Sequence, residues 1–121
     1  MLKLIKFRMH NQSVSNGDTT FLNPFSYLVI RRNKHLVKPI ANIEIDGGLL
    51  VLLLKLCLGW KVKRISFDMT SLAPKVFSQA EESGRSLYFV GSKEEEISQA
   101  LEVIKSEFPR INVIKYRNGY F

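Results

Sequence analysis

The sequence has one cysteine and two histidines among its 121 residues. A single cysteine excludes an internal disulfide framework and favours a reducing compartment, so we expect a cytoplasmic location. Cys57 falls within an apolar segment, where a small buried hydrophobic side chain is the usual role of this residue type. His10 and His35 have no His, Cys or carboxylate at ligand spacing. The sequence therefore predicts no metal centre.

Long hydrophobic runs are also missing. The longest apolar run, Leu49–Leu58, is interrupted by Lys55 and spans ten residues, whereas a helix that crosses a bilayer needs about 20. The opening residues are too short and too often interrupted by lysine to form the apolar core of a secretory signal. These features predict a cytoplasmic protein that is soluble or attached peripherally to a membrane.

Positive charge is plentiful but uneven. The net charge is +7, and residues 1–64 carry eleven Lys and Arg against three acids, whereas residues 65–121 are close to neutral. A basic field of this kind can attract nucleic acid, anionic lipid headgroups or a diphosphate substrate, and it is equally consistent with a solvated surface. Because aromatic residues do not alternate with the cations in a stacking pattern, nucleic-acid binding is not expected.

Hydrophobic periodicity predicts strands that alternate with helices. The expected strands are Lys3–Met9, Thr19–Leu22, a segment ending at Ile45, Val62–Ile65, Leu87–Val90 and Ile111–Tyr116. The expected helices begin at Pro24, Leu49, Ser71 and Ser92, and the last of them ends near Phe108. We expect the helix over Leu49–Leu58 to be buried and the strand over Leu87–Val90 to be covered on both faces. This order predicts one α/β domain over residues 1–121, with a Rossmann-like, mostly parallel sheet and helices on both faces.

Two polar residues fall where a predicted strand gives way to a helix. Asp46 precedes Gly47 and Gly48, and Asn23 precedes Pro24. Ligands of open α/β sheets gather beyond the carboxyl ends of the strands, where helix N-terminal N–H groups also point. At such a junction Asp46 is consistent either with an N-cap or with a general base that faces a pocket.

A turn after the strand over Leu87–Val90 is a weaker candidate. Gly91, Ser92 and Lys93 would present N–H groups and a cation to a phosphate. The turn lacks the dinucleotide and Walker patterns, so a plain structural turn is favoured by the local sequence. Ser92 and Glu95 have the spacing of a capping box at the start of the last helix.

Six segments taken together resemble a known family in their order and spacing. They are Phe21-Leu22-Asn23-Pro24, Asp46-Gly47, Arg64 to Asp68, Leu87 to Lys93, Phe108-Pro109 and Gly119-Tyr120-Phe121. From about Thr19 onward the chain resembles the WecG/TagA/CpsF glycosyltransferases. The resemblance implies an inverting transferase that needs no metal. Such an enzyme moves a hexose or N-acetylhexosamine from a UDP-sugar to a polyprenyl-diphosphate-linked acceptor during bacterial surface polysaccharide synthesis, in peripheral contact with the inner face of the plasma membrane.

The resemblance also implies roles for individual residues. Asp46 matches the aspartate proposed as general base on the acceptor hydroxyl, and Gly47 follows it in the same junction. Asn23 matches the asparagine of a Thr-x-Asn element at the substrate pocket. Arg64 matches an arginine proposed to engage a diphosphate. A guanidinium can bind phosphate oxygens through two parallel hydrogen bonds and stabilise the charge of a leaving UDP.

The resemblance places Gly91 and Ser92 in a turn on the nucleotide side. Two features depart from the family pattern: Phe21 stands where the family usually has the threonine, and family members continue with a second half beyond Phe121. We therefore expect the N-terminal portion of such an enzyme. The alternative is a catalytically inactive fragment that acts as an interaction module, for which an uncovered sheet edge would favour self-association.

Overall fold

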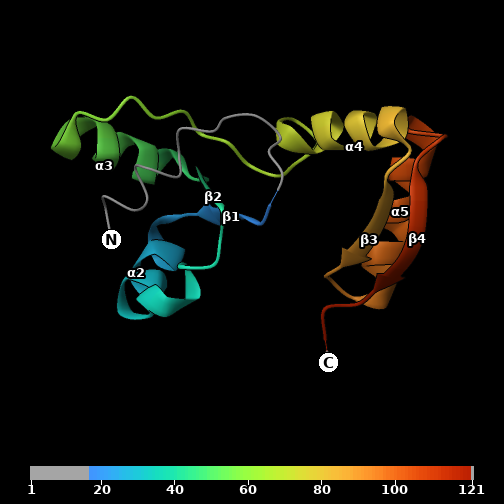
Figure 1. Ribbon diagram of the computed structural model, residues 1–121, viewed down its shortest axis with the longest axis horizontal. Coiled ribbons are helices and arrows are strands. Elements are labelled where there is room, and N and C mark those ends of the chain that lie inside the picture. The colour runs from blue at the N-terminus through green and yellow to red at the C-terminus, as the bar shows by residue number, and fades with distance from the viewer. Residues whose placement is uncertain (1–16, 121) are drawn as a thin grey trace. The chain divides into compact units, whose positions relative to one another are not determined.

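The computed structural model of the chain describes residues 17–120. The chain falls into two compact units, which divide after Leu72 (Figure 1). The strand predicted over Lys3–Met9 lies outside the described residues, and the single domain expected over residues 1–121 stays a prediction.

The first unit pairs two short parallel strands with two helices. Strand β1 (Thr19–Leu22) lies beside β2 (Asn42–Ile45), and Leu22 is opposite Ile45 in the register. Helix α2 (Pro24–Arg32) follows β1, and helix α3 (Gly48–Leu58) follows β2, with a short 3-10 turn, Lys34–Leu36, after α2. Both strand-to-helix junctions predicted from the sequence are therefore present.

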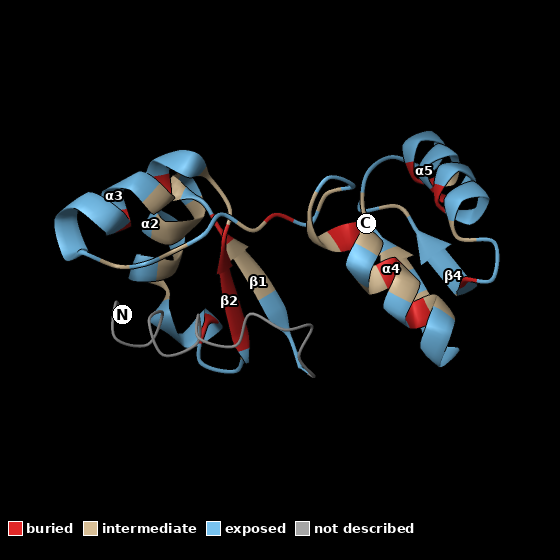
Figure 2. Ribbon diagram, turned by 90° about the horizontal axis from the view of Figure 1, so that it is seen from above, coloured by how far each residue is buried: buried red, intermediate tan, exposed pale blue. Residues whose placement is uncertain are grey.

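The core of the first unit joins the strands to both helices. Leu22, Ile43 and Ile45 are almost completely buried, and Leu50 and Leu54 of α3 pack against them. Strand β2 is buried along its whole length (Figure 2). Burial of each large aliphatic side chain contributes about 1.5–3 kcal/mol, so this cluster fixes the positions at which the two helices begin.

Helix α3 is more exposed than its sequence predicts. Among its residues only Leu50 and Leu54 are buried, whereas Leu56 is 73% exposed. A helix that is apolar on all sides is normally covered on all sides, and the predicted burial of Leu49–Leu58 is wrong for this structure. Cys57, expected in the core, is exposed as well.

The strand predicted over Val62–Ile65 does not form. The segment has no regular secondary structure, and the Ile65 N–H donates to the Ile45 carbonyl at 2.9 Å. This hydrogen bond holds the segment next to the end of β2 without a strand ladder. It thereby fixes the position of Arg64.

The second unit repeats the pattern of parallel strands joined through a helix. Its elements are α4 (Leu72–Ser83), β3 (Ser86–Val90), α5 (Glu94–Glu107) and β4 (Asn112–Arg117), and β3 is parallel to β4. Its core is centred on Phe77 of α4, whose ring lies 5.9 Å from that of Phe89 and 5.5 Å from that of Phe108, measured between centroids. Pro74 falls in the first turn of α4, as predicted.

The strands confirm the predicted fold class and correct one detail of it. The α/β character and the parallel pairing are confirmed. Strand β3 is not covered on both faces, because Tyr88 and Val90 are about half exposed. The described strands lie in two two-stranded sheets, so a continuous Rossmann-like sheet with helices on both faces stays a prediction.

Candidate functional site

The parallel register of β1 and β2 brings three predicted site residues together. The Asp46 N–H donates to the Leu22 carbonyl at 2.8 Å, directly beyond the paired ends of the strands. A Cβ placed on Gly47 would lie 3.7 Å from the Cβ of Asn23. Asn23, Asp46 and Gly47 therefore meet at the carboxyl edge of this sheet, as their positions after the strands predict.

Gly47 provides the backbone turn at this edge. Its φ angle is +130°, a conformation that residues with a Cβ rarely adopt. The same glycine lies close to α2, because an added Cβ would stand 3.5 Å from the Cδ of Pro24. The first turns of α2 and α3 thus approach each other beside Asp46.

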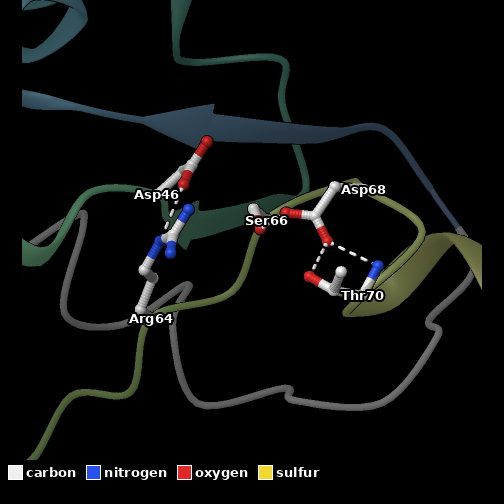
Figure 3. Close-up of polar contacts among 5 residues, drawn as sticks. All are labelled: Asp46, Arg64, Ser66, Asp68 and Thr70. Carbon is white, nitrogen blue, oxygen red and sulfur yellow. Dashed lines mark hydrogen bonds and ion pairs between the residues drawn. The ribbon is translucent and has the colours of Figure 1, made fainter.

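The Asp46 carboxylate faces Arg64 rather than the helix that follows it. Its Oδ1 lies 3.3 Å from the Arg64 Nε (Figure 3). The N-cap of α3 is Gly47, which provides no side-chain hydrogen bond. Of the two roles left open for Asp46, an N-cap of α3 is therefore wrong, and a general base stays a prediction. Both side chains of the pair are accessible, with Asp46 37% and Arg64 58% exposed.

Asn23 is a true helix cap, and the cap fixes its side chain. Its Oδ1 accepts from the Ser26 N–H at 2.8 Å, and its own N–H donates to the Ser26 Oγ at 2.8 Å. This reciprocal pair satisfies N–H groups at the start of α2. The Nδ2 amide of Asn23 has no partner among residues 17–120, so it is a donor held in place beside Asp46.

A polar cluster next to Arg64 was not singled out from the sequence. Asp68 accepts from the Ser66 hydroxyl, from the Thr70 N–H at 2.9 Å and from the Thr70 Oγ1 at 2.7 Å (Figure 3). The hydrogen bonds from Ser66 and then Thr70 lower the pKa of Asp68, and the charge of Arg64 adds to them. The Ser71 N–H also donates to the Asp68 carbonyl at 3.1 Å. The spacing Ser-x-Asp-x-Thr is typical of such turns and is the signal that predicts the cluster.

Two residues on the strands complete the surroundings of the site. Glu44 of β2 is only 9% exposed, and its burial raises the pKa of the carboxyl. Phe21 is opposite Glu44 in the register, and its ring lies 6.2 Å from that of Phe67 between centroids. Phe21 therefore makes an aromatic contact at the position where a threonine was expected.

Gly91 and Ser92 lie in the second unit, in the turn between β3 and α5. Gly91 has a φ of +153° and Ser92 a φ of +57°. The Gly91 N–H donates to the Arg117 carbonyl at 3.1 Å, and the Gly119 N–H donates to the Ser92 carbonyl at 2.9 Å. A Cβ on Gly119 would lie only 3.2 Å from the Gly91 Cα. The two glycines thus allow the chain after β4 to pack closely on this turn.

The Ser92 hydroxyl is already engaged by a carboxylate. It donates to Glu96, which also accepts from the Lys93 N–H at 3.2 Å. These bonds, with Ser92 the larger cause, lower the pKa of Glu96. The capping box predicted between Ser92 and Glu95 is therefore wrong, because α5 has its N-cap at Lys93 and the accepting residue is Glu96. A nucleotide-side role for Gly91 and Ser92 stays a prediction.

Neither a metal cluster nor a bilayer-spanning helix is found within the described part of the chain. No group of three His, Cys, Asp or Glu residues in residues 17–120 is arranged to hold a metal ion. None of the helices in the same range is long and apolar enough to cross a membrane.

Comparison with known proteins gives one family match. Residues 2–121 match the model described as "Glycosyl transferase WecG/TagA/CpsF family". The chain is 38% identical over 114 residues to "UDP-Gal:alpha-D-GlcNAc-diphosphoundecaprenol beta-1,4-galactosyltransferase" of Shigella boydii, an alignment that covers 93% of this chain and 47% of that relative. The chain thus spans about half the length of the curated relative it matches. No solved structure matches the chain significantly.

Proposed function

Because the chain belongs to the WecG/TagA/CpsF family of glycosyltransferases, we propose that it provides acceptor-side groups for sugar transfer. The donor is a UDP-sugar carrying a hexose or an N-acetylhexosamine, and the acceptor is a polyprenyl-diphosphate-linked sugar. The name of the Shigella relative states both substrate classes for that protein. The observation that carries the proposal is the accessible Asp46–Arg64 pair beside Asn23 at the carboxyl edge of the first sheet.

In the proposed reaction Asp46 is the general base. Its carboxylate accepts the proton of the acceptor hydroxyl while the hydroxyl oxygen forms a bond to the anomeric carbon of the donor. The bond from that carbon to the UDP oxygen breaks, and UDP leaves with the electron pair, so that the anomeric configuration inverts. General-base catalysis requires a distance of about 2.6–3.2 Å to the hydroxyl. The 37% exposure of the Asp46 side chain leaves room for this approach.

Arg64 and Asn23 supply hydrogen-bond donors around that carboxylate. The Arg64 guanidinium is exposed and contacts Asp46 through Nε, and a guanidinium has further N–H groups that can donate to phosphate oxygens. A fixed cation at this position stabilises negative charge on a diphosphate without a metal ion. The Nδ2 amide of Asn23 is held by the α2 cap and donates to a substrate oxygen.

The acceptor class places the reaction at a membrane surface. A polyprenyl lipid stays in the bilayer, so the proposed enzyme works at the inner face of the plasma membrane as a peripheral protein. The excess of cations in residues 1–64 suits anionic headgroups on that face. The alternative of an inactive interaction module is not favoured by the family match, and self-association stays a prediction.

Calorimetric titration of the chain with UDP and with a UDP-N-acetylhexosamine is the first test of the proposal. We expect saturable heat that disappears in Arg64→Ala. Arg32→Ala is the matched control, because Arg32 is an exposed arginine at the end of α2, and it should bind as the unmodified chain does. A folded chain that gives no heat with either ligand would contradict a diphosphate role for Arg64.

Transfer itself is tested with the chain joined to the second half of the Shigella relative. The assay follows sugar passing from a radiolabelled UDP-sugar to a lipid-extractable product. Labelled product that requires a polyprenyl-diphosphate-linked acceptor supports the proposed reaction. Hydrolysis of the donor without any labelled lipid would contradict it.

A further inference from the structure

An apolar groove lies between α2 and α3 in the first unit. Its volume is about 440 Å³, within the range of roughly 300–1,000 Å³ typical of ligand pockets. Helix α2 contributes Tyr27 and Leu28, and α3 contributes Leu53 and Cys57 among others. The described residues that line the groove include no charged side chain, so a polar ligand would lose hydration there without compensation.

The groove begins at the candidate site. Pro24, which lines its near end, directly follows Asn23 in the sequence. Pro24 also approaches Gly47, where an added Cβ would be 3.5 Å from the Pro24 Cδ. From there the lining continues along α3 to Leu58, the last residue of the helix. An acceptor whose hydroxyl is held at Asp46 can therefore extend into the groove.

Several side chains that line the groove remain in contact with water. Leu28 is 55% exposed and Leu53 is 45% exposed, and Cys57 is exposed too. Leu50 and Leu54 belong to the buried core of the unit and also line the groove. The exposed side chains therefore contribute little to folding, and covering them with an apolar ligand lowers the free energy of the complex.

We propose that this groove binds the isoprenoid chain of the lipid-linked acceptor. The inference rests on the proposed function, which supplies a ligand with an anionic diphosphate and a long apolar tail. The diphosphate is complementary to the N-terminal N–H groups of α3, because its N-cap Gly47 provides no side-chain acceptor for them. The tail is complementary to the uncharged groove that starts beside the same helix N-terminus.

The far end of the groove has the charge expected where a lipid tail enters a bilayer. After Leu58 the chain turns at Gly59, and Lys55, Lys61 and Lys63 line an open cavity of about 720 Å³. Lysines beside an apolar exit attract anionic headgroups. The tail thus passes from the groove to a part of the surface that favours a negatively charged membrane.

Cys57 is a built-in reporter for occupancy of the groove. It is exposed, it lines the groove, and it is the only cysteine of the chain. The experiment measures the rate at which a maleimide labels Cys57 with farnesyl diphosphate present, and compares it with inorganic pyrophosphate. At about nine times its dissociation constant, farnesyl diphosphate occupies ~90% of the sites and slows labelling about tenfold. Pyrophosphate, which lacks the tail, should leave the rate unchanged.

Variants on α3 then separate the groove from the rest of the helix. Leu53→Gln removes an apolar side chain from the lining and should weaken farnesyl diphosphate binding by about tenfold. Leu56→Gln is the matched control, because Leu56 is an exposed leucine on the same helix outside the lining, and it should bind normally. If Leu53→Gln fails to fold by circular dichroism, Leu28→Gln tests the opposite wall of the groove.

The other possible results either overturn the tail site or overturn the proposed reaction. Labelling that farnesyl diphosphate does not slow, in a chain that binds UDP, refutes the tail site and leaves the proposed reaction intact. If farnesyl diphosphate still slows the labelling of Cys57 but the chain neither binds UDP nor supports transfer, the proposed reaction is refuted instead. Protection by phosphatidylglycerol vesicles that contain no polyprenyl lipid assigns the groove to the bilayer. Protection that rises with protein concentration alone assigns it to a second copy of the chain.

Discussion

Replacing Asp46 by Asn separates a catalytic role of this residue from a structural one. The Asp46 side chain is 37% exposed and the Arg64 side chain 58% exposed, and the ion pair between them spans 3.3 Å. Exposed ion pairs of this kind contribute about 0–1 kcal/mol. Asn has nearly the same size, and the start of α3 is capped at Gly47 without the Asp46 side chain. We therefore expect the free energy of unfolding to fall by less than about 1 kcal/mol.

The same substitution should nearly abolish sugar transfer. An amide cannot accept the proton of the acceptor hydroxyl, and loss of a general base slows a reaction by about 10²–10⁴. At 1.36 kcal/mol for each factor of ten, this corresponds to ~3–5 kcal/mol of transition-state stabilisation. The assay compares initial transfer rates of the chain joined to the second half of the Shigella relative, with and without the substitution, at saturating UDP-sugar.

A matched control distinguishes catalysis from a general effect of charge. Asp18→Asn makes the same change at another exposed acid beside β1 and should leave the transfer rate unchanged. Full turnover by the Asp46→Asn variant would refute the general-base role. An unfolding free energy lowered by more than about 2 kcal/mol would refute the assessment of the Asp46–Arg64 pair as a weak surface contact.

Three further predictions concern the scaffold of the site. Leu22→Ala should lower the free energy of urea unfolding by about 2–5 kcal/mol, because Leu22 is fully buried. Leu49→Ala is the control: Leu49 is 60% exposed, and its substitution should change the free energy of unfolding by about 0.5 kcal/mol or less. Gly47→Ala should cost about 1–3 kcal/mol in the same experiment through its φ of +130°; a neutral effect would contradict the strained turn. Asp68→Asn should lower the melting temperature at pH 7. Hydrogen bonds hold the folded pKa of Asp68 below its ordinary value of 3.8. The stability that the Asp68 carboxylate contributes is therefore present above that value and is lost as the pH falls through the folded pKa. The difference in melting temperature between the variant and the unmodified chain must therefore shrink in acid.

The strand-to-helix junctions could be predicted because local chemistry determines them. Asn is a preferred N-cap residue and Pro a preferred first helical residue, as Asn23 and Pro24 are here, and a glycine after Asp46 permits the backbone turn that the next helix requires. Parallel pairing then brings the two junctions to one edge of the sheet. The contact between Asp46 and Arg64 could not be predicted from the sequence, since it depends on the hydrogen bond from Ile65 to Ile45 that places the segment after α3.

The start of α5 shows how a local rule fails by one residue. Ser92 and Glu95 have the spacing of a capping box, but an N-cap residue needs extended backbone angles. Ser92 instead has a φ of +57°, whereas Lys93 has φ −81° and ψ 162°. The left-handed turn at Ser92 moves the cap to Lys93 and the accepting carboxylate to Glu96. The close packing of Gly119 on this turn comes from a distant part of the sequence and could not be predicted from the local pattern.

The burial of α3 was predicted wrongly because the sequence shows which side chains are apolar but not which of them pack against other elements. The core needs one stripe of the helix, which Leu50 and Leu54 supply at a spacing of four residues. Leu53 and Cys57 have the same spacing on the neighbouring stripe, and they line the groove together with Leu50 and Leu54. An apolar stripe that contributes to folding and one that binds a ligand have the same sequence pattern. Only the difference in exposure between Leu50, at 6%, and Leu53, at 45%, distinguishes them, and for that reason the groove was found in the structure and not in the sequence.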